Sequence, residues 1–158
     1  MTLNAYQRYV NFCNTAPFHV QRLAALMSAV PVELYNLTLV LKMISKENGM
    51  GEENHTRLVS ALFSSEILFL NSDQYCCDFY ADEYADIRAL LNKTLPAREL
   101  AKVIDLVGVD LARQVGKSID EFLESFSDES TPIQLRNFAN VTKTVLSRMG
   151  EDYAFYAK

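Results

Sequence analysis

The chain has 158 residues, of which 49% are hydrophobic, and carries a net charge of −5 at pH 7. This length is enough to bury one real core and is short for two, so we expect a single domain over residues 1–158, with a lobe at 1–94 and another at 95–158. The acidic balance excludes the basic footprint that favours nucleic acids or anionic membranes, so protein or small-molecule partners are favoured.

The sequence predicts a soluble, cytoplasmic protein. Its first residues lack the charged and then apolar layout of a signal peptide, and no apolar run approaches the roughly 20 residues of a membrane helix. The three cysteines, Cys13, Cys76 and Cys77, are an odd number, and adjacent cysteines do not normally form a disulfide with each other. We therefore expect reduced, buried thiols.

Apolar residues recur at helical spacing through the first 46 residues. A first helix, in which Tyr6 and Cys13 are among the apolar positions at helical spacing, ends before Pro17, which suits the first turn of a second helix. Pro31 opens a third helix. Its wide apolar stripe, which starts at Leu34, predicts the most buried helix of the chain.

Two helices followed by a hairpin make up residues 31–80, which is the order of elements in a winged helix. The polar residues 71–74 have turn chemistry and separate two runs rich in branched and aromatic residues. A wing should bury Phe69 and Phe79 against the two preceding helices, because an isolated hairpin is marginal in water. Residues 67–70 are apolar on both faces, however, and fit the last turn of a helix equally well.

The second helix of that pair, residues 52–63, begins with Glu52 and Glu53 and has Phe63 on its inner face. A DNA-binding winged helix would present this helix to the nucleic acid, where two carboxylates would face phosphates with only Arg57 to offset them. Protein contact is the better use of this surface. A nucleic-acid-binding regulator is the alternative.

The chain after the hairpin reads as further helices. Asp82 can cap a helix that stops before Pro96, and helical spacing then continues from Pro96 through Gly108, which weakens that helix by roughly 1 kcal/mol relative to alanine. Capping boxes at residues 118–121 and 131–134 open a short helix and a last one. The fold class is therefore mainly α, with a winged-helix-like N-terminal half, one β-hairpin and a C-terminal helical bundle.

No pattern in the sequence predicts a reaction. Glu52 and His55 form an E-x-x-H pair, which is half of a di-iron site, but Ala16 stands three positions before the other histidine, His19. Four carboxylates cluster at the end of the hairpin and just after it, but they lack the spacing of a calcium loop and read as a solvated turn and helix start; they are Asp78, Asp82, Glu83 and Asp86. We expect a protein that is not an enzyme, with no cofactor and no metal.

We expect partner-binding residues at the start of the 52–63 helix and in the aromatic tail. They are Glu52, Glu53, His55, Arg57, Tyr153, Phe155 and Tyr156. The expected partner is another protein or an adjoining domain of a longer polypeptide. Self-association stays open, whereas nucleic acid and membrane are disfavoured.

Several segments carry a family likeness when they are taken in order. Residues 23–32 end in valine, proline and a hydrophobic residue. Residues 55–65 form a helix that starts with histidine and ends in leucine and small residues, and residues 86–91 read D-I-R-A-L-L. Residues 116–122 and 138–150 add a G-x-x-x-x-x-F signal and a closing aromatic-A-x-V…V-L-x-x-hydrophobic-G signal.

In this order the segments resemble a domain of bacterial conflict and signalling proteins, which accompanies STAND-type NTPases, vWA–MoxR-associated proteins, and WD40 or formylglycine-generating-enzyme-like domains. The resemblance implies a non-catalytic, winged-helix-like adaptor, usually a segment of a longer protein, and it supplies no catalytic residues. One departure is the start of the 52–63 helix, where the family usually has a proline-rich linker.

Overall fold

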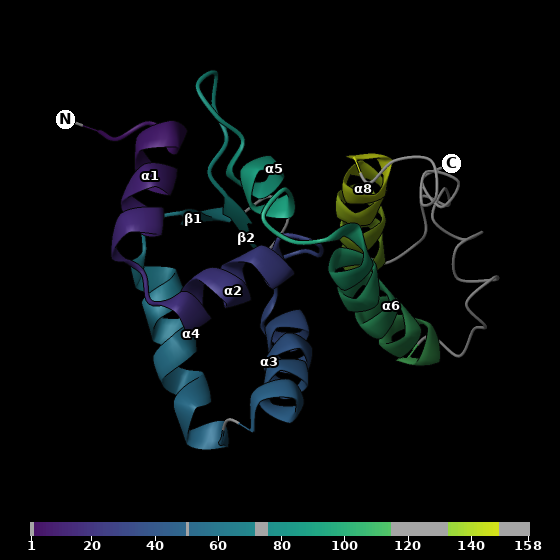
Figure 1. Cartoon of the computed structure of the whole chain (residues 1–158). Helices are drawn as coiled ribbons and strands as arrows, with labels where there is room; N and C mark the ends of the chain where they lie inside the picture. The colour runs from purple at the N-terminus through teal and green to yellow at the C-terminus, as the bar shows by residue number, and fades with distance from the viewer. Residues whose placement is uncertain (1, 50, 72–75, 115–132, 149–158) are drawn as a thin grey trace.

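The fold is mainly helical, with one β-hairpin (Figure 1). The computed structural model describes residues 2–49, 51–71, 76–114 and 133–148. In Figure 1, α2 crosses above α3 and α4, and α6 lies beside α8. The elements are α1 (Ala5–Thr15), α2 (Phe18–Met27), α3 (Leu34–Asn48), the 3-10 turn η1 (Glu52–Asn54), α4 (His55–Ser64), β1 (Leu68–Asn71), β2 (Cys76–Phe79), α5 (Ile87–Asn92), α6 (Ala97–Gln114) and α8 (Ile133–Arg148).

The predicted hairpin is present. Strands β1 and β2 pair antiparallel, with Leu68 opposite Phe79 and Asn71 opposite Cys76. The short connection between α2 and α3 is also extended and pairs with β2. In this bridge the Cys77 amide donates to the Val32 carbonyl at 3.3 Å. The turn predicted at residues 72–75 lies outside the described residues, and the chain at Val32 is extended rather than part of the third helix.

Glu66 decides between the two interpretations of residues 67–70. Its φ is +67°, in the left-handed region that stops a right-handed helix, so α4 ends at Ser64 and the chain turns into β1. The Arg8 guanidinium donates to the Glu66 carbonyl at 2.9 Å and holds this turn from α1. A continuous helix through residue 70 is therefore excluded, and Ile67 becomes fully buried in the core.

Only one of the two hairpin phenylalanines is buried as expected. Phe79 is 3% exposed, within the same buried cluster as Leu37 of α3 and Leu62 of α4. Phe69 is 36% exposed, so its predicted burial is wrong. It points to the other face of the sheet and lies 5.0 Å from the Tyr80 ring, between centroids.

The most buried helix is α2. The sequence predicted that the following helix, α3, would be the most buried one, and this prediction is wrong. Every residue from 23 to 30 is buried, including the three that follow the end of α2. In α3 the buried residues start at Asn36, and the apolar buried face starts at Leu37. Leu34 is the first residue of α3, one turn before that face, and is 78% exposed.

Two further residues, Cys13 and Phe63, were wrongly predicted to be buried. In α1 the buried residues are Ala5 and Phe12, whereas Tyr6 and Cys13 are exposed, so Cys13 is not a buried thiol. Phe63 in α4 is also exposed. In each case the core covers a narrower stripe than the run of apolar residues on that helix.

The long helix α6 runs through Gly108 without a break, as predicted. A side chain at this position would come 3.2 Å from the Phe138 ring of α8, so the glycine allows the two helices to approach closely. One buried cluster includes residues of α2, α3, α6 and α8. The helix predicted from the box at residues 118–121 lies outside the described residues, as does the start of the box at 131–134.

Candidate functional site

The described residues predicted to bind a partner lie at the start of α4. Glu53 is in η1 and is exposed, as is Arg57 in α4, whereas His55 is half-buried. The side chain of Glu52 is outside the described part of the chain, together with Tyr153, Phe155 and Tyr156 of the tail. Of the predicted binding residues, His55 is therefore the one whose side chain is partly buried and has a hydrogen-bond partner in the structure.

His55 joins the start of α4 to the end of α3. Its Nε2 lies 2.6 Å from Oγ of Ser45, which is in the last turn of α3. The hydrogen bond spans the short connection through η1 and fixes the imidazole ring against α3. It places a ring that can donate or accept a hydrogen bond at the edge of a groove.

A groove of about 490 Å³ lies between α3, the start of α4 and α6. Its apolar side chains, Leu39, Met43 and Leu106, are half-buried. The Tyr35 hydroxyl donates to Asp110 of α6, which ties the two long helices together beside it. The residues that line the groove are Leu39, Lys42, Met43, Ser45, Lys46, His55 and Leu106.

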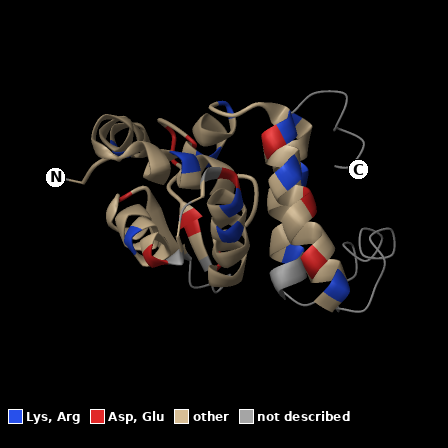
Figure 2. Ribbon diagram, turned by 60° about the horizontal axis from the view of Figure 1, so that its bottom comes forward, with Lys and Arg blue, Asp and Glu red and all other residues tan. Residues whose placement is uncertain are grey.

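The lysines of this groove differ from the basic residues next to it. Arg22 and Lys102 both bind Glu47, at 3.0 and 3.1 Å, and the Lys102 hydrogen bond is the main reason why the pKa of the Glu47 carboxyl is lowered. Lys42 and Lys46 are exposed and form no ion pair with another described residue. Figure 2 shows charges of both signs along α6.

A serine bonded to a histidine is also half of a nucleophilic hydrolase site, so Ser45 and His55 need to be weighed as a catalytic pair. Such a site requires a group that orients the histidine and donors that stabilise an oxyanion. The hydrogen bonds of the described residues include no acceptor for the second ring nitrogen of His55. Ser45 also lies at the C-terminal end of α3, whose partial negative charge opposes an alkoxide. The contact is better explained as a tie between helices.

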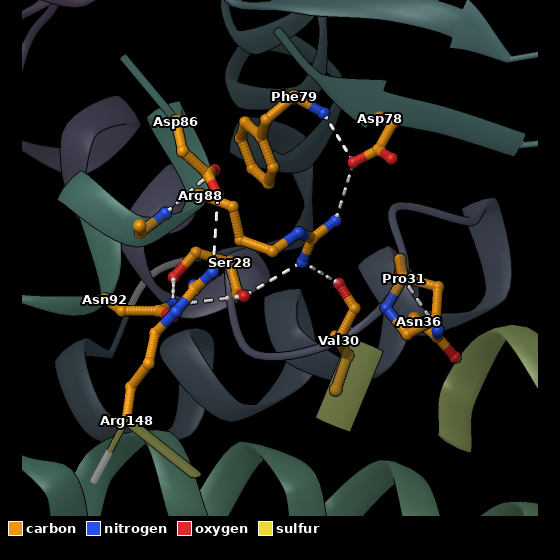
Figure 3. Close-up of polar contacts among 11 residues, drawn as sticks. Ser28, Val30, Pro31, Asn36, Asp78, Phe79, Asp86, Arg88, Asn92 and Arg148 are labelled. Carbon is orange, nitrogen blue, oxygen red and sulfur yellow. Dashed lines mark hydrogen bonds and ion pairs between the residues drawn. The ribbon is translucent and has the colours of Figure 1, made fainter. Parts of the chain in front are cut away.

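A second polar cluster, centred on Arg88, lies in the core (Figure 3). The Arg88 guanidinium is buried and donates to the carbonyls of Ser28 and Val30 at 2.9 and 2.8 Å. It also contacts the Asp78 carboxylate of β2 at 3.1 Å. Burial lowers the pKa of Arg88, and the charge of Asp78 opposes this shift.

Asn92 and Arg148 extend the cluster toward α8. The Asn92 amide donates to Oγ of Ser28 at 2.8 Å, and its carbonyl accepts from Arg148 at 3.0 Å. Arg148 also contacts Asp86 at 3.3 Å. This chain of contacts links the end of α2, β2, α5 and α8, and its side chains are all engaged with one another or with the backbone. We interpret it as structural.

Three acidic residues of β2 and the segment that follows it are used in the same way. Asp78 binds Arg88, and Asp86 caps α5 by accepting from the Ala89 amide at 3.2 Å. Asp82 does not cap that helix, contrary to the prediction, because α5 begins only at Ile87; it accepts from the Ala5 amide at the start of α1, at 2.8 Å. Within the described residues, no group of three or more His, Cys, Asp or Glu side chains is arranged to hold a metal.

Sequence reasoning did not identify Arg88 or the groove. The signal for Arg88 was a cation between two apolar residues in the D-I-R-A-L-L run, but the two carbonyls that it binds lie 58 and 60 residues earlier. No helix among the described residues is both long enough and apolar enough to span a bilayer. Comparisons with protein-family models, curated proteins and solved structures find no match.

Proposed function

We propose that the chain is a non-catalytic protein-interaction module of the adaptor type, and that the α3–α4–α6 groove is its binding site. The groove is the observation that carries this proposal. It combines half-buried apolar side chains with lysines that have no ion-pair partner among the described residues. Binding sites for partner side chains have this character, with an apolar interior and a few polar groups that give orientation.

The order of the elements supports a winged-helix-like adaptor of the kind found in bacterial conflict and signalling proteins. Helix α2, the extended residue Val32, α3, α4 and the hairpin follow one another, and Val32 adds to the β2 edge. The likeness of the quoted segments to that domain family adds to this proposal. In such a system the module would connect a partner protein, or an adjoining domain, to an effector.

In-cell crosslinking tests the proposal. A photoreactive side chain is introduced at position 46 of the tagged chain, in the groove, and at position 93 as a control, because Lys93 is also an exposed lysine at a helix end. We expect one discrete protein to crosslink from position 46 in the native host and not from position 93. If neither position yields a crosslinked protein under conditions where the chain is abundant and folded, the adaptor proposal is wrong.

A nucleic-acid-binding regulator is the competing function, and exposed Arg57 at the start of α4 is the observation that favours it. Its neighbour Glu53 is also exposed and opposes phosphate binding. The alternative requires an affinity for duplex DNA that rises steeply as salt is lowered and that falls on Arg57→Ala. Absence of binding at low salt would exclude it.

A further inference from the structure

The groove carries positive charge although the chain is acidic overall. Lys42 and Lys46 are one turn apart in α3, and Leu39 and Met43 are on the same side of the helix, at spacings of three and four residues. His55 adds a polar ring at the end of the groove. Because the whole chain has a net charge of −5, a surface with two lysines beside apolar side chains differs from the overall charge of the protein.

Both lysines are available to a ligand, as far as the described residues show. The adjacent basic residues Arg22 and Lys102 are already bound to Glu47, whereas Lys42 and Lys46 have no carboxylate partner in the described part of the chain. The acid closest in sequence to the groove on α6 is Asp105. It is not among the lining residues, and partial burial alone raises its pKa, without a contribution from a lysine.

We propose that the groove binds an acidic segment of a partner protein, in which one or two apolar side chains lie between carboxylates. This inference rests on the proposed adaptor function and specifies the partner. The volume of about 490 Å³ is in the range of pockets that take small groups of side chains. The apolar residues enter between Leu39, Met43 and Leu106, and the carboxylates contact the two lysines.

The lining favours a peptide over other anionic ligands. Single-stranded nucleic acids bind grooves in which bases stack on aromatic rings, and none of the lining residues is a phenylalanine or a tyrosine. A free phosphate would leave the apolar side chains unused. Carboxylates with an interposed leucine or methionine satisfy both parts of the groove, which is why we infer an acidic and apolar segment.

The test selects peptides and then measures them on charge variants. A display library of random 12-residue peptides is selected on the immobilised chain, and the enriched peptides are synthesised with a fluorescent label. Their affinity is measured by anisotropy for the unmodified chain, for the double variant Lys42→Glu/Lys46→Glu, and for Lys93→Glu as the matched control. A milder double variant, Lys42→Gln/Lys46→Gln, covers the case in which charge reversal disturbs α3. Circular dichroism checks that each variant is folded.

We expect enriched peptides with net negative charge and at least one large apolar residue. Their affinity should fall about tenfold or more in the Lys42→Glu/Lys46→Glu variant, less in the glutamine variant, and not at all in Lys93→Glu, because two attractions become repulsions. The affinity should also weaken as salt is raised, since the charges at this rim are exposed.

Three results of the peptide selection and of the affinity measurements would overturn the inference. They are failure to enrich any peptide, enrichment of neutral or basic peptides, and acidic peptides that bind the double-reversal variant as well as the unmodified chain. Anionic lipid vesicles or duplex DNA that compete for the groove better than the selected peptides would also overturn it. The adaptor function fails separately, through the crosslinking experiment: a protein captured from position 46 with no preference for acidic segments leaves that function standing and removes only the partner chemistry.

Discussion

Arg88 replaces hydrogen bonds that a helix would otherwise supply. Helix α2 ends at Met27, and the buried carbonyls of Ser28 and Val30 follow it at a point where no further turn of helix can satisfy them. A guanidinium presents several donors in a fixed plane, so one side chain reaches both carbonyls and the Asp78 carboxylate. The sequence could predict that residues 86–91 are helical. It could not predict the two carbonyl partners, because they lie 60 and 58 residues earlier in the chain.

Replacing Arg88 should be among the more damaging single changes. Arg88→Met leaves the buried Val30 carbonyl without a donor and Asp78 unpaired, whereas the Ser28 carbonyl keeps the Asn92 amide as a donor at 3.2 Å. Loss of one member of a buried ion pair typically costs about 3–5 kcal/mol. Chemical denaturation measures the free energy of unfolding. Arg57→Met, at an exposed arginine, is the control and should change it by less than about 0.5 kcal/mol. Equal stability of the two variants would show that the cluster is not structural.

Asp82 predicts an acid-sensitive contribution to stability. The hydrogen bond from the Ala5 amide, with further bonds from Tyr84 and Ala85, lowers the pKa of Asp82 below its ordinary value of 3.8. A carboxyl with a lowered folded-state pKa stabilises the fold above its unfolded pKa, and this stabilisation is lost as pH falls through the folded value.

We therefore expect Asp82→Asn to flatten the pH dependence of unfolding below about pH 4, because the asparagine does not titrate. Denaturation curves at a series of pH values measure this effect. Glu83→Gln, at an exposed neighbouring acid, serves as the control. Identical pH profiles for Asp82→Asn and the unmodified chain would contradict the assignment of this contribution to Asp82.

The hairpin is the element that the sequence predicted best, and its orientation is what the sequence could not predict. Turn chemistry and the alternation of the second strand predicted a hairpin, but residues 67–70 are apolar on both faces and fitted the end of a helix equally well. Pattern alone therefore could not say which face is covered. The structure resolves this through Glu66, whose left-handed backbone ends α4 and turns Ile67 inward. A glutamate at that position gives no turn signal, because glycine and asparagine are the usual residues there.

The two hairpin phenylalanines should differ sharply on truncation. Phe79→Ala removes a ring that is almost fully buried and should cost about 3–5 kcal/mol. Phe69→Ala removes a partly exposed ring whose aromatic neighbour is Tyr80, and should cost about 0.5–1.5 kcal/mol. Urea denaturation of both variants gives the comparison. A larger loss for Phe69→Ala than for Phe79→Ala would mean that the sheet packs on the core through its other face.

At the scale of the whole molecule, the contact between Gly108 and Phe138 allows α6 and α8 to pack closely. The sequence predicted one helix through Gly108 and indicated only that the glycine lowers the stability of that helix. The structure gives the reason for it, because a Cβ would lie 3.2 Å from the buried Phe138 ring. That partner is 30 residues later in the chain. Helical periodicity defines the faces of both helices but not which residues meet.

A double-mutant cycle tests this contact. Gly108→Ala alone gains about 1 kcal/mol of helix propensity but presses on Phe138, so its net effect on unfolding should be small or destabilising. In a Phe138→Leu background the space is relieved, and the same change should stabilise the chain relative to Phe138→Leu alone. The difference between the two effects measures the coupling. Additive effects would show that the ring does not restrict position 108.

The unbroken burial of residues 23–30 has a consequence for how the chain tolerates variation. An ordinary amphipathic helix rejects polar substitutions only at the buried positions, which recur every three or four residues, so its tolerance oscillates with the helical period. Here residues 23–30, which are the second half of α2 and the three residues after it, have no exposed side, because their side chains are covered all round and the carbonyls of Ser28 and Val30 bind Arg88. In a saturation-mutagenesis library scored for folded protein, these eight positions should form one continuous block that rejects charged residues, whereas α3 should show the periodic pattern.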